Sequence, residues 1–596
     1  MTYSQSWDLK DFYPNYGGPE YTSHWAYLEK TISDFKAQIV SNGALTESSA
    51  ADWADFYDRL EHYGLELGHM SSYLGCLSSA DALNDDYKRD LAKLSAFSPQ
   101  IEEVMEKFQL VLGQAEERDF EALLAQPKTK DLRYNLTRLR TQARRKMPLE
   151  QEMLASELDV NGLSAWSRLY DSVSGKLKFE LKTSKGTRTV PFAQKRTLLE
   201  DNDPEVRLGA LRDSNAAIAE IEDVFASALN AIAGTRHTLY ARRGIKHFLE
   251  PAMWSGACDQ STIETMYDVV RARAEVPRAY LRRKAKVLGV KQLGFQDLDA
   301  PLPLKDSGRF EWNQGCEMVL KSFADSYPAL HKYSQMALQK SWIESAPSDR
   351  KRPGGFCTGS DKVKQQRIFM TYGGSLGDIQ TLAHELGHAF HSWTMRELHP
   401  ARLNYPMTLA ETASTFAQTI VAQALAKDPS LPSSVHAQML TTLLNDGATF
   451  CLDIQMRYEF EKRFYEARKA GELSASELKA LMVDVQKEVF GDSLDPEQLD
   501  PYFWASKLHF YIGGLSFYNF PYSFGYLLSR ALLARFREEG PSFLPKYEKL
   551  LMQSASATCE DAVRDSIGAD IRRPEFWHGA LDEIEGDLKK FETLKI

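Results

Sequence analysis

The chain has 596 residues, of which 43% are hydrophobic and 26% charged, and its formal net charge is −10. This balance is typical of a globular protein with a large core and excludes disordered, fibrous and membrane-spanning classes. The modest acidic excess argues against a dedicated nucleic-acid binder, which needs clustered basic charge. No run reaches the roughly 18 apolar residues of a spanning helix, so we expect neither nucleic acid nor membrane as a partner.

The N-terminal stretch "MTYSQSWDLKDFYPNY" has no basic segment followed by an apolar one, so it shows no secretory signal. The six cysteines stand singly, without a CxxC pair. Isolated thiols of this kind are typical of a reducing compartment, and we therefore expect a cytoplasmic protein. The sequon at Asn135 would then carry no glycan.

Apolar residues recur every three or four positions through most of the chain, as in residues 210–240, which predicts a mostly α-helical fold. We expect the basic run at residues 138–146 to be a solvated helix face. Leu177, Phe179 and Leu181 alternate with polar residues before a Ser-Lys-Gly turn, which predicts a small β-hairpin.

A second extended segment, Ile368–Tyr372, is closed by two glycines and precedes a histidine-rich helix. The edge of such a strand could bind an extended peptide through backbone hydrogen bonds. The polar stretch "LEDNDPEVR" suggests a boundary near residue 195, which would separate an N-terminal helical lobe (1–195) from a catalytic lobe (196–596). No internal repeat is evident, which argues against a solenoid.

The histidine-rich stretch "TLAHELGHAFHSW" lies in a predicted helix. Ser375 and Asp378 form a start signal for this helix, and Pro400 forms a stop signal. His384 and His388 are four residues apart, about 40° around the helix and about 6 Å along it, so both imidazoles can reach one metal ion. Glu385 lies beside the pair and could act on a water molecule there, as in the H-E-x-x-H arrangement.

A catalytic zinc ion takes three protein ligands, so a third must come from elsewhere. His391 is too close along the helix to bind the same ion easily, and we expect it to have a packing or supporting role. A metzincin would place its third histidine where this chain has Thr394, so that class is excluded. Glu397 is about 180° around the helix from His388 and faces away.

Glu411, on a second predicted helix, is the remaining nearby acid. Its alternative role is local, because Thr408 and Glu411 fit a T-x-x-E capping box that needs no metal. If Glu411 is the third ligand, the set of two histidines and one glutamate is a recognised catalytic zinc type. Zinc would then activate water and polarise a carbonyl while Glu385 transfers the proton, which is chemistry suited to amide hydrolysis.

Far downstream, the segment "KLHFYIGGLSFYNFPYSFGYLLSRAL" is rich in aromatic residues. Such runs usually belong to a core. Phenol hydroxyls and an imidazole near flexible glycines could also donate hydrogen bonds to an oxyanion. The candidates are His509, Tyr518, Tyr522 and Tyr526.

The motifs "TLAHELGHAFHS", "LAETAST" and this aromatic segment, with "WDLKDFYP" near the start, resemble the oligoendopeptidase F branch of the thimet oligopeptidase family of zinc metallopeptidases. The resemblance implies a multi-helix saddle or clam-like body around a deep channel, with a small β-sheet or hairpin near the active site. It implies one Zn²⁺, and substrates that are short unstructured peptides.

By motif position, the resemblance makes His384, His388 and Glu411 the zinc ligands and Glu385 the general base and acid. It makes His509 and the three tyrosines candidates for substrate binding and transition-state stabilisation, with Tyr522 placed slightly first. The spacer "IGGLS" is longer than the usual branch pattern, so the choice among Tyr518, Tyr522 and Tyr526 stays open.

The sequence therefore predicts a zinc endopeptidase for short peptides. One rival is a helical zinc carboxypeptidase, which would need a charged clamp for a free C-terminus. The other is an inactive peptide-binding scaffold. The oligomeric state is not indicated by the sequence.

Overall fold

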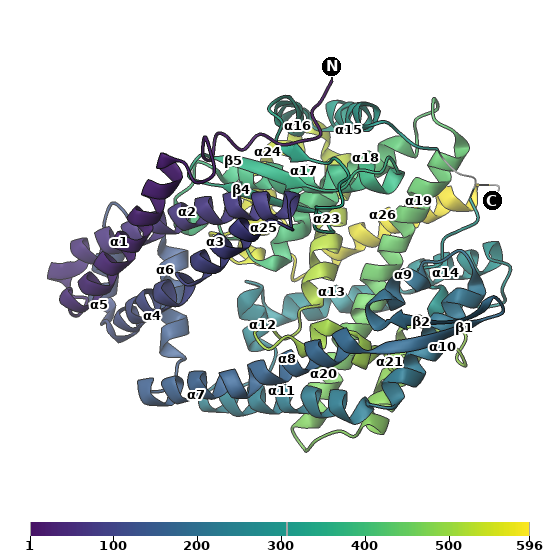
Figure 1. Cartoon of the computed structure of the whole chain (residues 1–596), viewed down its shortest axis with the longest axis horizontal. Coiled ribbons are helices and arrows are strands. Elements are labelled where there is room, and N and C mark those ends of the chain that lie inside the picture. Colours follow the sequence, from purple (N-terminus) through teal and green to yellow (C-terminus); the bar gives the residue numbers. More distant parts are fainter. Residues whose placement is uncertain (1, 305–307, 595–596) are drawn as a thin grey trace.

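The computed structural model describes residues 2–304 and 308–594, and helices form most of it (Figure 1), as the sequence predicts. The N-terminal helices are α1 (Pro19–Ser41), α2 (Ala50–Ala80), α3 (Asp85–Ser95), α4 (Ser98–Gln114), α5 (Glu117–Leu124) and α6 (Arg133–Arg144). They share one hydrophobic core, in which the rings of Tyr57 and Phe108 stack with their centroids 5.1 Å apart.

A second and larger core extends from Leu163 to Phe591 and also takes in Tyr3. Its helices are α8 (Leu163–Lys176), α9 (Lys195–Leu199), α10 (Pro204–Ala219), α11 (Glu222–Arg242), α12 (Glu250–Ser255), α13 (Gln260–Ala272), α14 (Glu275–Val287), α15 (Trp312–Ser326), α16 (Pro328–Gln339), α17 (Leu376–Met395), α18 (Met407–Leu425), α19 (Ser433–Ala448), α20 (Ile454–Arg468), α21 (Ala475–Phe490), α22 (Phe503–Ser506), α23 (Phe520–Glu539), α24 (Leu544–Gln553), α25 (Cys559–Ile567) and α26 (Pro574–Glu592). Between the two cores, α7 (Leu149–Asn161) buries none of its side chains. The lobe boundary near residue 195 stays a prediction.

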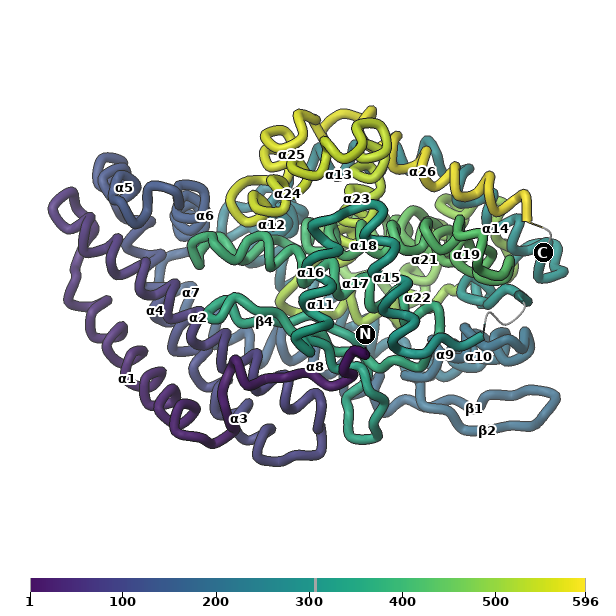
Figure 2. The backbone as a smooth tube through the Cα atoms, turned by 90° about the horizontal axis from the view of Figure 1, so that it is seen from above, coloured from purple at the N-terminus to yellow at the C-terminus, as the bar shows by residue number. Residues whose placement is uncertain are grey.

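Two small sheets complete the fold. Strands β1 (Lys178–Thr183) and β2 (Gly186–Pro191) pair antiparallel and form the predicted hairpin. Strands β3 (Ile343–Glu344), β4 (Phe356–Ser360) and β5 (Gln365–Phe369) form a sheet in the order β3-β5-β4, with β3 parallel and β4 antiparallel to β5. Figure 2 shows the hairpin at one edge of the molecule, far from β4.

The second extended segment differs from its prediction in two respects. Strand β5 spans Gln365–Phe369 rather than Ile368–Tyr372, and it lies in the middle of its sheet, where Ile368 and Phe369 are buried. The edges are formed by the two-residue strand β3 and by β4. Strand order depends on pairing between distant segments, which alternation along one strand does not reveal. The edge available to an extended peptide is therefore that of β4.

The basic run at residues 138–146 is a solvated helix face only in part, because Arg144, Arg145 and Lys146 are exposed as predicted but Arg138 and Arg140 are not. Arg140 is 4% exposed, pairs with Glu117 and donates to the carbonyl oxygen of Ala115. The guanidinium of Arg138 lies 4.4 Å from the ring centroid of Trp254. These side chains join helices rather than face solvent, because a guanidinium that is hydrogen-bonded or stacked can be buried.

Helix α17 begins as predicted, because Ser375 and Asp378 form a reciprocal capping box. It packs on α18 through Gly387, where an added Cβ would lie 2.5 Å from the carbonyl oxygen of Ala413. Helix α23 meets α18 just as closely, since a Cβ on Gly525 would lie 3.0 Å from that of Glu411. These three helices lie together near the centre of Figure 1.

No described helix is both long and apolar enough to cross a bilayer. All six cysteines are free thiols.

The close approach at Gly387 generates a stability prediction. Gly387→Ala should destabilise the protein by about 1–3 kcal/mol, because the added methyl group meets backbone atoms of α18 that have no room to move. Gly586→Ala in α26 is the matched control, since its added Cβ would meet nothing within 4 Å. Thermal unfolding should show a lower midpoint only for the first variant, and equal midpoints would contradict the packing argument.

Candidate active site

Three side chains from two helices converge on one point. His384 and His388 extend from α17, and Glu411 extends from α18. The Oε2 atom of Glu411 lies 3.3 Å from Nε2 of His384 and 3.5 Å from Nε2 of His388. Ligand atoms bound to one tetrahedral zinc ion at about 2.0–2.1 Å are separated by similar distances. The structure thus brings together the three residues that the sequence singles out as ligands.

The capping-box alternative for Glu411 is wrong. Helix α18 begins at Met407 after Pro406, and no side chain caps it. Thr408 donates instead to the carbonyl oxygen of Gly256. Glu411 therefore projects its carboxylate towards the histidines, where Oε2 also accepts a hydrogen bond from Ser414 at 2.8 Å.

His384 has a hydrogen-bond partner on the side of its ring that faces away from Glu411. Nδ1 of His384 lies 3.0 Å from Oε1 of Gln418, and an amide oxygen can only accept, so Nδ1 carries a proton. Once Nε2 of His384 has lost its own proton, it can offer its lone pair to a cation, which is the arrangement that metal-binding histidines require.

Gln418 was missed in the sequence analysis, although a signal for it existed. It is seven residues after Glu411, and two helical turns return to within about 20° of the same direction. A polar residue at that spacing faces the same site as the glutamate. Gln418 thus lies where it can orient His384.

The charges within the group favour a bound cation. Burial alone would raise the pKa of Glu411, but a proton that occupies Nε2 of His384 when no metal is bound lowers this pKa to about 2, together with the charge of His388. Burial alone would lower the pKa of His384, and the hydrogen bond to Glu411 raises it. This proton is the positive charge that a metal ion would replace. Burial lowers the pKa of His388 to about 4. An ionised carboxylate and an imidazole that stays neutral are the protonation states of metal ligands.

Glu385 lies beside this group on the wall of a cavity of about 450 Å³. Its side chain is 6% exposed, and its Oε2 atom has no hydrogen-bond partner among the described residues. Burial raises the pKa of Glu385 to about 7. A buried carboxylate without a protein partner can accept a proton from a molecule in the cavity. Strand β4 lines the same cavity with its residues Phe356, Cys357, Thr358 and Gly359.

The two other residues considered as ligands lie outside the group. His391 is fully buried, stacks on Tyr405 with centroids 4.0 Å apart and lies 3.0 Å from the hydroxyl of Ser554. Glu397 is exposed and pairs with Lys364. His391 therefore has the packing role expected of it.

A second cavity of about 250 Å³ adjoins the other side of the group, and both Tyr522 and Tyr526 line it. Neither cavity is lined by His509 or Tyr518. These two residues instead contact Tyr522, with ring centroids at 6.1 Å and 5.6 Å from its ring. Tyr522 thus connects the aromatic cluster to His384, His388 and Glu411, the candidate metal-ligand group.

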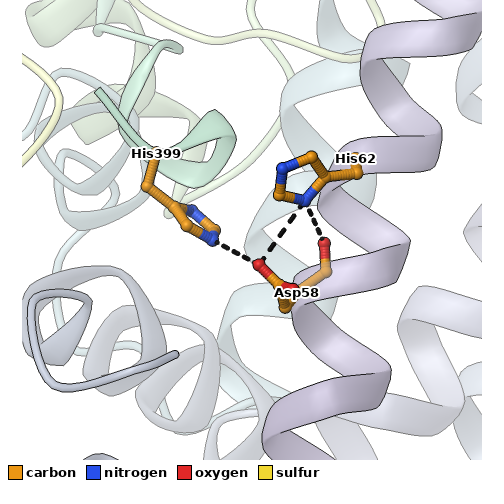
Figure 3. Close-up of side chains that lie close together, drawn as sticks. All are labelled: Asp58, His62 and His399. Carbon is orange, nitrogen blue, oxygen red and sulfur yellow. Dashed lines mark hydrogen bonds and ion pairs between the residues drawn. The ribbon is translucent and has the colours of Figure 1, made fainter. Parts of the chain in front are cut away.

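Asp58, His62 and His399 form a second histidine–carboxylate group (Figure 3), with N–O distances of 3.2 and 3.4 Å. Its protons are arranged differently. The backbone N–H of Ala401 donates to Nδ1 of His399, so Nε2 carries the proton and donates to Asp58. Nδ1 of His62 lies 2.7 Å from the backbone carbonyl oxygen of Asp58 and must donate to it. Both nitrogens that face Asp58 are therefore protonated.

Lys128 also lies 3.0 Å from Oδ2 of Asp58 and supplies a positive charge. The second group is therefore satisfied by hydrogen bonds without a metal. It fastens α2 to the segment that connects α17 and α18.

Comparison with known proteins agrees with this geometry. Residues 197–579 match peptidase family M3, and residues 112–179 match oligopeptidase F. An oligoendopeptidase F homolog of Lactococcus lactis subsp. lactis (strain IL1403) is 24% identical, over 75% of this chain and 73% of the relative. A homolog from Borreliella burgdorferi is 22% identical, over 99% and 98% of the two chains.

Solved structures share the fold. Oligoendopeptidase-F from Enterococcus faecium superposes with a TM-score of 0.68 at 19% identity, over 96% of this chain and 99% of the other. A Chlamydophila abortus structure gives a TM-score of 0.84 at 19% identity, over 100% and 98%. Because the family match spans more than half of the chain, the protein belongs to peptidase family M3, in its oligopeptidase F branch, and is a metalloendopeptidase.

Proposed function

We propose that the protein is a zinc-dependent oligoendopeptidase that cleaves internal bonds of short unstructured peptides. The observation that carries the proposal is the convergence of two imidazole nitrogens and one carboxylate oxygen beside the unpartnered carboxylate of Glu385. His384, His388 and Glu411 would hold one Zn²⁺ per chain. When bound, zinc supplies a Lewis acid that polarises the scissile carbonyl and makes water more acidic.

The residues of the chain account for the proton transfers. Glu385 takes a proton from the attacking water molecule and later delivers it to the leaving nitrogen, so that the amine departs neutral. Its buried position favours this role because water is excluded from the carboxylate except through the cavity. Gln418 keeps the proton of His384 on Nδ1.

The free edge of β4 supports binding of an extended substrate. The strand lines the cavity that contains Glu385, and its unpaired edge can hydrogen-bond a peptide backbone without regard to side chains. Tyr522 lines the adjoining cavity, so its hydroxyl is the best placed of the cluster to donate to the oxyanion of the transition state. His509, Tyr518 and Tyr526 support Tyr522 or bind the substrate.

The carboxypeptidase alternative is less well supported. It needs a cationic clamp for the terminal carboxylate, whereas the charged residues that line the two cavities, among those described, are acids and histidines. The six free thiols support a cytoplasmic location.

Internally quenched peptides with both termini blocked test the proposed activity. The protein should cleave them, should lose activity with a chelator and should regain it with zinc. Glu385→Gln should retain zinc but lower kcat by about 10²–10⁴-fold, because it removes the proton acceptor. Glu397→Gln, on the exposed surface, should have nearly wild-type rates. Cleavage that requires a free terminus would overturn the endopeptidase assignment.

Measurements of zinc binding distinguish Glu411, a proposed ligand, from Gln418, which only orients the ligand His384. Glu411→Ala should abolish stoichiometric zinc binding, measured by elemental analysis of dialysed protein. Gln418→Leu should weaken zinc binding by about 10–100-fold without abolishing it, because the ligands remain while His384 loses its orienting acceptor. Zinc retained at full stoichiometry by Glu411→Ala would exclude it as a ligand.

The aromatic cluster yields a kinetic prediction. Tyr522→Phe should lower kcat by about 10²-fold and change KM little, because its hydroxyl acts on the developing oxyanion. Tyr526→Phe serves as the comparison, since its hydroxyl is buried and lacks a partner. A larger loss of kcat in Tyr526→Phe would move the role to that residue.

A further inference from the structure

Asp446 is an acid beside the active site that takes no part in the proposed metal binding or proton transfers. It lies in the last turn of α19 and lines the smaller cavity, next to the proposed ligands. The remaining lining residues of this cavity come from α17, from α18, from the turn after α19 and from α23; they are His384, Glu411, Thr415, Gln418, Thr419, Phe450, Tyr522 and Tyr526. A side chain placed in this cavity would touch both the metal-ligand group and Asp446.

The end of α19 is held firmly in place. Tyr280 donates to the side-chain oxygen of Asn445 at 2.6 Å, immediately before Asp446. After α19 the chain forms a π-helical turn at Thr449–Asp453, and such turns occur frequently at functional sites. The carbonyl oxygen of Phe450 in this turn accepts a hydrogen bond from Ser523 at 2.6 Å, and its ring stacks on Tyr526 with centroids 4.6 Å apart. These contacts fix the positions of the residues that form the cavity wall.

The carboxylate of Asp446 has no hydrogen-bond or ion-pair partner among the described residues. Burial raises the pKa of Asp446 to about 7, although the charges of Arg530 and His384 lower it, and the guanidinium of Arg530 is already paired with Asp587. The side chain of Asp446 is partly exposed, and it lines the cavity. A largely desolvated carboxyl group without a partner is unfavourable, and a cationic group in the cavity would pair with this one.

Neighbouring side chains can assist a cationic guest. Thr419 donates to the backbone oxygen of Thr415, which leaves the lone pairs of its own hydroxyl available to accept. Gln418 uses its amide oxygen for His384. The cavity of about 250 Å³ is large enough for one long side chain, and Phe450 and Tyr526 offer aromatic surface to its methylene groups.

We propose that this cavity binds the side chain of a substrate residue next to the scissile bond, and that Asp446 selects lysine or arginine there. This inference rests on the proposed peptidase function. It assigns Asp446 to substrate specificity and gives it no part in the chemical step.

The test uses blocked, internally quenched peptides that differ only beside the cleaved bond, with Lys, Gln or Glu placed first on one side and then on the other. At one of the two positions the wild-type enzyme should rank them Lys, Gln, Glu in falling order of kcat/KM. Asp446→Asn should reduce the Lys-to-Gln ratio at that position by about tenfold, because a charged partner is replaced by a neutral one. Mass spectrometry of the products confirms that the cleaved bond is unchanged.

Asp484→Asn is the matched control, because Asp484 is an exposed acid of α21 that lines neither cavity. It should leave the Lys-to-Gln ratio as in the wild type. An equal ratio in wild type and Asp446→Asn would overturn the inference, as would a wild-type enzyme without preference at both positions. The wild-type ranking tests the inference even if Asp446→Asn folds poorly. Failure of the underlying function is a different result, since the wild type would then cleave none of the blocked peptides.

Discussion

The close contact between α17 and α18 at Gly387 is the constraint on which the site depends. The absence of a side chain there lets the backbone of α18 approach α17, and this places Oε2 of Glu411 within 3.5 Å of both imidazoles. The same approach lets Gln418 reach the far side of His384. One small residue between two histidines thus sets both the ligand geometry and the histidine tautomer. Helix α23 then closes on Glu411 through Gly525 and brings Tyr522 to the neighbouring cavity.

The metal-ligand group separates two cavities of different character. The larger one contains the unpartnered carboxylate of Glu385 and the edge strand β4, which suits a peptide backbone and its proton transfers. The smaller one contains Asp446 and the tyrosines, which suits a side chain and a developing oxyanion. Both share His384 and Glu411, so under the proposed function a substrate that spans them would present its scissile carbonyl to this group. Asp58 and His399 hold the segment that joins the two ligand helices, and so tie the N-terminal helices to this arrangement.

The parts of the site that depend on one helix could be predicted from helical geometry, whereas Glu411, on a second helix, is reached only as the remaining nearby acid and through the family resemblance. Contacts that depend on packing between distant segments could not be predicted. The spacing of His384 and His388 follows from the helical period alone. Local rules misled at Thr408, because its hydroxyl bonds to Gly256, about 150 positions away, instead of capping its own helix. The central position of β5 and the burial of Arg140 likewise come from distant partners. Asp446 belongs to no sequence motif, and its position beside the site is apparent only from the cavity that it lines.

The central claim is that the group on α17 and α18 is the metal centre. A crystal structure of the zinc-loaded protein, with anomalous data collected at the zinc absorption edge, tests it most directly. The account predicts one strong peak, about 2.0–2.2 Å from Nε2 of His384, Nε2 of His388 and Oε2 of Glu411. It predicts no peak of comparable occupancy between Asp58 and His399, whose nitrogens carry protons there. A peak at Asp58 and His399, with none at Glu411, would contradict it.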